Sequence, residues 1–130
     1  MDYLNLIKEA RLAMGNAYAP YSHFSVGAAL LAKDGTIYRG CNVENASYGA
    51  TNCAERTALF SAIADGTTEF EAIAVVGSSG DFTYPCGICR QVIAELMPEG
   101  KLIFSNKEDE YKVYTLDEIL PHSFTGKDLK

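Results

Sequence analysis

The sequence predicts an α/β fold in which helices cover a mixed sheet of five strands. Apolar segments at 24–31 and 37–40 flank an Asp-Gly turn, which is the strongest short signal for a β-hairpin. Further strand-like segments follow at 70–76, 101–105 and 111–115, and a helix-forming segment separates the first two of these. A hairpin joins antiparallel strands, whereas a helical crossover joins parallel ones, so the predicted sheet contains both kinds of pairing.

Two helices are predicted in the first half of the chain. Residues 3–18 carry apolar side chains at helical spacing, which indicates an amphipathic packing helix that Pro20 ends. Residues 53–64 are rich in helix-forming residues, and Gly66 follows where a glycine commonly ends a helix.

Two more helices are predicted in the second half. Pro85 is typical of a helix start, and the helix that follows covers residues 86–97. Thr115 and Glu118 have the spacing of a capping box, which predicts a short last helix that stops at Pro121. The segments 42–52 and 77–85 are therefore loops that each lead into a helix.

Length and composition predict one domain over residues 1–130. A chain of this length buries about two-thirds of its unfolded surface, and 48% of its residues are hydrophobic, so it can form a core without disulfides. The first residues include an early acid and no apolar segment, so we expect no secretory signal. No apolar stretch approaches the ~20 residues of a membrane helix.

The charge balance argues against a nucleic-acid polymer as partner. Acidic residues outnumber basic ones 17 to 11, the formal charge is −6, and the isoelectric point is about 4.8. Binding to a polynucleotide usually requires a basic stripe that neutralises phosphates. The basic residues are scattered here, so we expect a small, uncharged partner and no membrane.

Three of the four cysteines have the spacing of a metal site. Cys86 and Cys89 lie within one turn at the start of a predicted helix, and Cys53 begins another helix. Three protein ligands are typical of catalytic zinc, because the fourth position remains open to water. Helix N-termini also favour the thiolate form of cysteine. We therefore predict a catalytic zinc ion held by Cys53, Cys86 and Cys89.

Glu55 and Arg56 follow Cys53 directly and complete this prediction. Glu55 lies to one side of the ligand, where a carboxylate can exchange protons with water without binding the metal. Three thiolates give zinc a net negative charge, which weakens its action on water. We predict that Arg56 donates to the ligand sulfurs and withdraws part of that charge.

Two other interpretations of the cysteines remain open at this point. A Cys-x-x-Cys pair is also found in redox proteins, although such a pair does not require a third cysteine beside a glutamate. A structural site with four cysteines would recruit Cys41. Cys41 ends a predicted strand, away from any helix start, so we interpret it as a small buried apolar residue.

The sequence resembles the zinc-dependent cytidine deaminases, specifically their small, homotetrameric, nucleoside-acting form. The resemblance extends from residues 18–22 to residues 121–124, and four stretches carry it: FSVGAAL at 24–30, NVENA at 42–46, CAERTA at 53–58 and PCGICRQV at 85–92. Zinc deaminases share a His/Cys-x-Glu and Pro-Cys-x-x-Cys signature in which the glutamate is not a ligand. The resemblance implies a three-layer sandwich with helices on both faces of the sheet and one Zn²⁺ per subunit.

The resemblance also implies roles for the residues around the metal. Asn42 and Glu44 would bind the ribose, since an amide and a carboxylate suit the donors and acceptors of sugar hydroxyls. Phe24 would pack against the pyrimidine, and Ala54, through its backbone, together with Glu55 would bind the base edge. By pattern alone, Asn42 is typical of a turn, Glu44 of a solvated charge and Phe24 of a core strand.

In the resembled family, neighbouring subunits complete each site, and Tyr48 and Phe124 match the positions that do so. Phe124 lies in a polar tail, where an exposed aromatic side chain suggests a partner surface.

The predicted activity is hydrolytic deamination of cytidine and 2′-deoxycytidine to the uridine counterparts and ammonia, and the resemblance implies pyrimidine salvage in the cytoplasm. Three other functions are compatible with parts of the sequence: a deaminase of a nucleoside antibiotic such as blasticidin S, a polynucleotide cytosine deaminase and a non-catalytic zinc module. The Asn42 and Glu44 pair favours an ordinary ribose over the antibiotic. The acidic chain argues against the polynucleotide.

Overall fold

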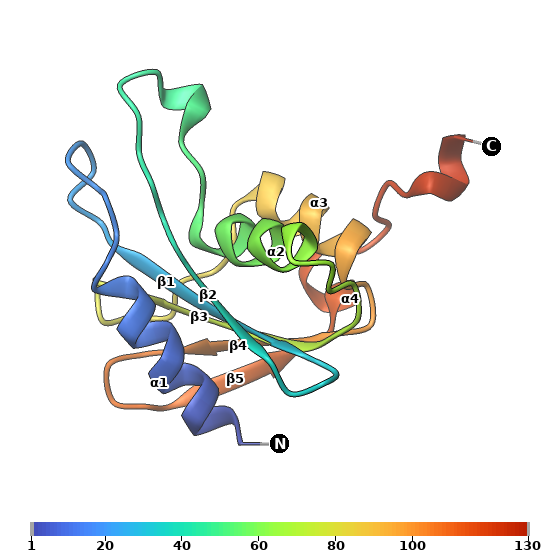
Figure 1. Cartoon of the computed structure of the whole chain (residues 1–130), viewed down its shortest axis with the longest axis horizontal. Helices are drawn as coiled ribbons and strands as arrows, with labels where there is room; N and C mark the ends of the chain where they lie inside the picture. Colours follow the sequence, from blue (N-terminus) through green and yellow to red (C-terminus); the bar gives the residue numbers. More distant parts are fainter. Residues whose placement is uncertain (1, 130) are drawn as a thin grey trace.

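The structure, a computed structural model, describes residues 2–129; Met1 and Lys130, the two ends of the predicted domain, lie outside the described residues. Five strands form one sheet in the order β2-β1-β3-β4-β5 (Figure 1). Their bounds are β1 (Val26–Ala32), β2 (Ile37–Cys41), β3 (Phe70–Gly77), β4 (Lys101–Ser105) and β5 (Tyr111–Tyr114).

The strand pairings confirm the predicted mixed sheet. β1 pairs antiparallel with β2 and with β3, and β4 pairs antiparallel with β5. β3 and β4 are parallel, and helix α3 (Gly87–Leu96) forms the crossover between them. At the β1–β2 turn, Gly35 has a φ of 93°, which a glycine adopts without strain, and Asp34 accepts a hydrogen bond from the backbone N–H of Thr36.

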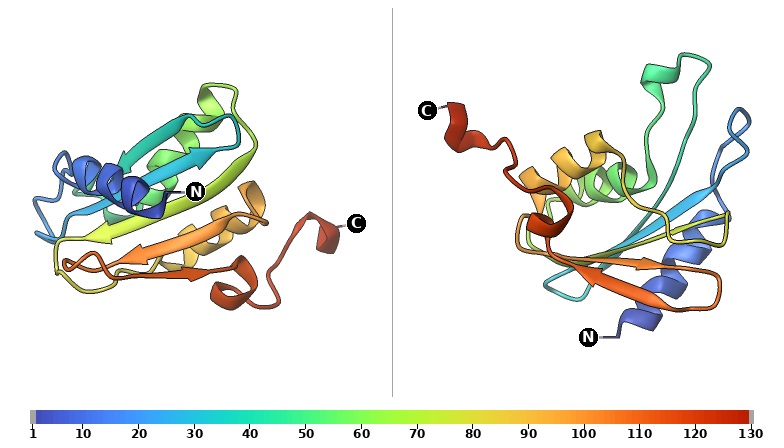
Figure 2. Two further views of the ribbon diagram at one scale, coloured as in Figure 1. Left: turned by 90° about the horizontal axis from the view of Figure 1, so that it is seen from below. Right: turned by 180° about the vertical axis from the view of Figure 1, so that it is seen from behind.

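Helices cover both faces of the sheet, which confirms the three-layer arrangement (Figures 1 and 2). Helix α1 (Tyr3–Met14) lies on one face, and α2 (Ala54–Ala64) and α3 lie on the other, with the short α4 (Leu116–Ile119) beside α3. Successive side chains of a strand point to opposite faces of the sheet, so the strands contribute to two hydrophobic cores, one on each face. The core under α1 contains Leu6, Ile7, Ala10, Ala29, Ala72, Ala74, Val76 and Ile103. The core under α2 and α3 includes Ala28, Leu30, Leu59, Ile73, Val75, Ile93, Leu102 and Phe104.

The first helix is shorter than predicted. α1 ends at Met14 rather than at Tyr18. Tyr18 instead forms a parallel bridge with Val43, in which its N–H donates to the carbonyl of Asn42 at 3.0 Å. This long-range pairing overrides the local helical pattern, and it ties the segment before β1 to the loop after β2.

The loops at 42–52 and 77–85 end at helix N-termini, as predicted. Cys53 is the N-cap of α2 and Cys86 is the N-cap of α3. α2 lies unusually close to β2 because Gly40 carries no side chain: a Cβ at Gly40 would overlap the carbonyl oxygen of Ala54 and lie 2.5 Å from the nitrogen of Ala58. This contact sets the position of the first turn of α2.

Two segments project from the body of the molecule. One is the loop that carries the short 3-10 helix η1 (Tyr48–Ala50), and the other is the C-terminal tail that ends in η2 (Gly126–Leu129) (Figures 1 and 2). No helix within residues 2–129 is both long enough and apolar enough to span a membrane.

The close packing of α2 on β2 predicts that Gly40→Ala destabilises the protein by about 1–3 kcal/mol, the usual cost of overpacking, since the new methyl group meets helix backbone. The free energy of unfolding, measured with a chemical denaturant, tests this. Gly126→Ala is the matched control because a Cβ there meets nothing within 4 Å. Equal stability of the two variants would contradict the prediction.

Candidate active site

Three cysteines from two helix starts converge on one point. The sulfur atoms of Cys53, Cys86 and Cys89 all lie within 4.8 Å of one another, and those of Cys53 and Cys86 are 3.8 Å apart. Two sulfurs that each lie about 2.3 Å from one tetrahedral Zn²⁺ are about 3.8 Å apart, so the spacing fits zinc. Cys41 is not part of this group within residues 2–129. The arrangement is therefore a three-thiol site, the ligand number of catalytic zinc.

The fold explains why these thiols suit a cation. Cys53 and Cys86 stand at the positive ends of two helices, and the N–H of Cys89 donates to the Cys86 sulfur at 3.5 Å. Cys89 is fully buried, whereas Cys86 is exposed and Cys53 is half-buried. One side of the site is thus closed by the core and the other faces the surface.

Arg56 occupies the position that the sequence predicted for it. Its Nη2 lies 3.3 Å from the Cys53 sulfur. Hydrogen bonds from the Cys89 thiol and the Arg56 guanidinium lower the pKa of Cys53 to about 5. The pKa of Cys89 is raised because its thiol donates to Cys53 and is buried. Arg56 therefore favours the thiolate form of a metal ligand.

Arg90, the other cation near the cysteines in the sequence, has a different environment. Its Nε donates to the carbonyl of Pro85 at 2.8 Å, and its Nη1 donates to the carbonyl of Ile119 at 2.7 Å. Arg90 thereby fastens the start of α3 to the end of α4.

Glu55 is buried beside the three sulfurs. Only 4% of it is exposed, and burial raises the pKa of its carboxyl to about 7, with a smaller contribution from the nearby Cys53. A carboxyl group with this pKa can both hold and release a proton near neutral pH. The environment of Glu55 is therefore compatible with proton transfer, and its catalytic role stays a prediction.

A cavity of about 310 Å³ opens in front of Glu55 and brings most of the predicted site residues together. It is lined by Ser22, Phe24, Val26, Asn42, Glu44, Thr51, Cys53, Ala54, Glu55, Thr83, Tyr84 and Cys86. The predicted base-contacting residues Phe24, Ala54 and Glu55 therefore share one space with the predicted sugar-binding residues Asn42 and Glu44. Phe24 lies just before β1 rather than within a strand.

The Asn42 side chain is nearly buried and holds the backbone at the start of β1. Its Oδ1 accepts from the N–H of Val26 at 2.9 Å, and its Nδ2 donates to the carbonyl of Phe24 at 2.8 Å. Since a carboxamide has two donor hydrogens and two acceptor lone pairs, half of its capacity remains for a ligand. Asn42 thus fixes Phe24 and can still meet a sugar hydroxyl.

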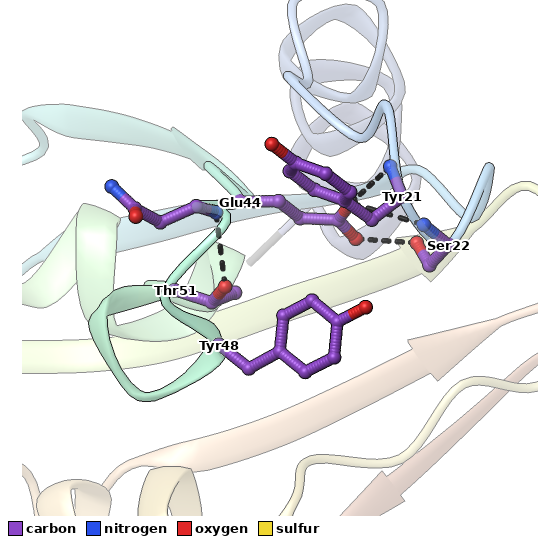
Figure 3. A pocket seen from close by; sticks show the side chains of 6 residues that line it. Tyr21, Ser22, Glu44, Tyr48 and Thr51 are labelled. Carbon is purple, nitrogen blue, oxygen red and sulfur yellow. Dashed lines mark hydrogen bonds between the residues drawn. The ribbon is translucent and has the colours of Figure 1, made fainter.

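Glu44 holds the turn that precedes Phe24. Its Oε1 accepts from the backbone N–H groups of Tyr21 and Ser22 at 3.0 and 3.1 Å, and its Oε2 accepts from the Ser22 hydroxyl (Figure 3). These bonds lower the pKa of the Glu44 carboxyl group and keep it ionised, and the bond from the Ser22 hydroxyl has the largest effect.

Sequence reasoning missed several residues of this cavity. Tyr84 lies directly before Pro85, and its ring packs against those of Phe104 and Tyr114, with centroids 4.9 and 6.1 Å apart. Its position next to the Pro-Cys-x-x-Cys segment could have identified it. Ser22 gave no such signal, because its contacts form only when the segments before β1 and after β2 meet.

Tyr48 and Phe124 do not line this cavity. Tyr48 is 75% exposed on the projecting loop, and Phe124 is 57% exposed on the tail, where its carbonyl accepts from Gln91 at 2.8 Å. Tyr48 instead lines an adjacent cavity of about 430 Å³, in which its ring lies 6.1 Å from that of Tyr21 (Figure 3).

Comparison with known proteins agrees with this geometry. The family model described as the cytidine and deoxycytidylate deaminase zinc-binding region matches residues 2–105. A cytidine deaminase of Halalkalibacterium halodurans is 53% identical over 130 residues, which cover 99% of this chain and 98% of that protein. One from Sporosarcina psychrophila is 49% identical, with 99% and 96% covered.

A solved structure shows the same fold. The crystal structure of cytidine deaminase from Burkholderia pseudomallei superimposes with a TM-score of 0.91 at 51% identity, and covers 95% of this chain and 100% of that one. The family match includes all three cysteines, whose spacing fits zinc. The chain therefore belongs to the cytidine and deoxycytidylate deaminase family of zinc enzymes.

Proposed function

We propose that the protein deaminates free pyrimidine nucleosides, converting cytidine and 2′-deoxycytidine to uridine and 2′-deoxyuridine with release of ammonia. The observation that carries this proposal is the buried Glu55 beside three convergent thiols, at the base of a cavity that also holds Asn42 and Glu44. The proposed role is the salvage of pyrimidine nucleosides.

Proton transfer is the task of Glu55. Cys53, Cys86 and Cys89 would hold a zinc ion, which would supply the Lewis acidity that makes water a nucleophile near neutral pH. Glu55 accepts one proton of the attacking water as the water oxygen bonds to C4 of the base, and passes that proton to N3. Glu55 then takes the remaining proton from the new C4 hydroxyl group and delivers it to the amine at C4, so the C4–N bond breaks, ammonia leaves and the C4 carbonyl of the product forms.

Orientation is the task of the remaining cavity residues. Phe24 offers an apolar face against the pyrimidine, and the backbone of Ala54 lies at the start of α2 beside Glu55. Asn42 and Glu44 keep hydrogen-bonding capacity for the sugar hydroxyls. The base is thereby directed toward Glu55 and the sugar toward the opening.

The charge of the cavities favours a nucleoside over a nucleotide. Neither the catalytic cavity nor the adjacent one is lined by any lysine or arginine among the described residues, and Glu44 lies in both. A phosphate group there would lack the cationic partner that usually binds it and would face a carboxylate. The same absence disfavours a polynucleotide substrate.

We also propose a homotetramer in which Tyr48 and Phe124 complete the sites of neighbouring subunits. Support comes from their exposure on two projecting segments and from the open side of the site at Cys86. None of the four cysteines, all within residues 2–129, forms a disulfide, which supports a reducing, cytoplasmic location.

Glu55→Gln is expected to reduce cytidine turnover by about 10²- to 10⁴-fold, since an amide cannot relay protons, while fold and zinc content remain unchanged. The absorbance change as cytidine is consumed measures turnover, and metal analysis measures zinc. Near-normal activity in this variant would exclude Glu55 as the proton carrier.

Two cysteine variants serve as controls for that experiment. Cys89→Ser should lose zinc and activity together, and so should wild-type protein treated with a strong chelator. Cys41→Ser should retain both, because Cys41 is not part of the sulfur cluster. Loss of zinc in Cys41→Ser would instead support a structural four-cysteine site.

The lack of lysine and arginine among the described residues that line the two cavities predicts a preference for 2′-deoxycytidine over 2′-deoxycytidylate. We expect kcat/KM to be at least about a hundredfold higher for the nucleoside, since an uncompensated phosphate beside a carboxylate costs several kcal/mol. Both substrates are assayed at the same ionic strength. Comparable values for the two substrates would refute the proposed nucleoside specificity.

The shared site predicts complementation between two variants. Phe124→Ala should lower kcat/KM, and Glu55→Gln should be inactive. When the two chains are co-expressed, a subunit with intact Glu55 receives Phe124 from its neighbour, so activity per intact Glu55 should rise above that of Phe124→Ala alone. Sedimentation velocity should show a species of four chains. A monomer, or no rise in activity, would contradict the shared site.

A further inference from the structure

The hydroxyl group of Ser22 links the Glu44 carboxylate to the backbone of Phe24, and both residues line the catalytic cavity. It donates to Oε2 of Glu44, and it accepts a hydrogen bond from the backbone N–H of Phe24 at 3.0 Å. A hydroxyl group has a single proton to donate, so the longer 3.5 Å approach to the Phe24 carbonyl is not a second donation. The Phe24 carbonyl is bound by Asn42 instead. A continuous chain of hydrogen bonds therefore runs from Glu44 through Ser22 and Phe24 to Asn42.

The backbone between Ser22 and Phe24 is held in a tight turn. His23 has a φ of 56°, in the left-handed region that a residue with a side chain seldom adopts. A serine hydroxyl that accepts from the N–H two residues later stabilises such a turn. The His23 N–H also donates to the carbonyl of Ala19 at 3.1 Å. The Ser22 hydroxyl thus helps to offset a backbone conformation that places Phe24 against the cavity.

The same contacts limit what Glu44 can still bind. An ionised carboxylate has about four acceptor positions. Tyr21 and Ser22 fill three of them, two through backbone N–H groups and one through the Ser22 hydroxyl (Figure 3). About one position remains for a ligand, and its direction is fixed because both oxygens are already held.

We propose that Ser22 is a positioning residue that sets the Glu44 carboxylate at a fixed distance from Phe24 and thereby makes the enzyme selective for nucleosides that present one particular sugar hydroxyl. This inference rests on the proposed nucleoside deamination. In this proposal Ser22 acts through Glu44 on the sugar and through Phe24 on the base.

Ser22→Ala is expected to reduce kcat/KM for cytidine roughly tenfold, mostly through KM, because a hydrogen bond to a charged group is lost and the carboxylate is no longer aligned. Ser25→Ala is the matched control: it lies three residues away, and its hydroxyl makes no hydrogen bond within residues 2–129. Ser22→Thr retains the hydroxyl and should recover most of the activity. Zinc content and unfolding midpoint are measured for each variant.

Two further measurements separate positioning from a general structural effect. The defect of Ser22→Ala should shrink for whichever of 2′-deoxycytidine and 3′-deoxycytidine lacks the hydroxyl that Glu44 accepts. It should also shrink in the Glu44→Gln background, because the two substitutions then disrupt one interaction. A Ser22→Ala defect that is unchanged with both analogues and additive with Glu44→Gln would overturn the proposal.

Comparing wild-type protein with Ser22→Ala distinguishes a failure of the proposed function from a failure of the role proposed for Ser22. If wild-type protein fails to deaminate cytidine, the proposed function is wrong. If the wild type is active but Ser22→Ala matches Ser25→Ala, only the role of Ser22 is wrong. A tenfold rise in KM that Ser22→Thr reverses and that one deoxy analogue abolishes would establish it.

Discussion

Helices α2 and α3 begin side by side, and each begins with a cysteine at its N-cap. This convergence brings three thiols within 4.8 Å. Three ionised sulfurs so close together repel one another strongly, so the arrangement is stable only with a cation between them or with protons retained. The helix dipoles and Arg56 offset part of that charge. Glu55 is buried for the same reason, because it lies in the first turn of α2, two residues after Cys53.

The cavity contains two glutamates, Glu55 and Glu44, that differ in burial. Glu55 lies at the closed end, where low solvent exposure raises the pKa of its carboxyl and suits proton exchange. Glu44 lies toward the surface, where three donors keep it ionised as a hydrogen-bond acceptor. The two carboxyl groups thus have pKa values shifted in opposite directions because their surroundings differ. Ser22 accepts from the N–H of Phe24 and Asn42 donates to its carbonyl, so hydrogen bonds on both sides of the residue hold the Phe24 backbone beside the cavity.

The surface of one chain leaves part of this arrangement open. Cys86 is exposed, and the aromatic residues Tyr48 and Phe124 stand on segments that project away from the body. Exposed aromatic side chains of this kind are typical of surfaces that bind another molecule. The projecting loop is nevertheless anchored, because the residues on either side of it pair at the Val43–Asn52 bridge. The loop therefore has an anchored base and an exposed tip that carries Tyr48.

Features that depend on local spacing could be predicted from the amino-acid sequence. The Cys-x-x-Cys pair within one turn, the glutamate two residues after Cys53, the hairpin turn and the order of strands and helices all follow from local patterns, and the predicted sheet and layers were correct. Tertiary structure decided the rest. α1 ends early because Tyr18 pairs with Val43, Arg90 binds carbonyls rather than cysteines, and Ser22 meets Glu44 across the fold. Hydrogen bonds between distant segments carry no local pattern, since their partners are chosen by packing of the whole chain.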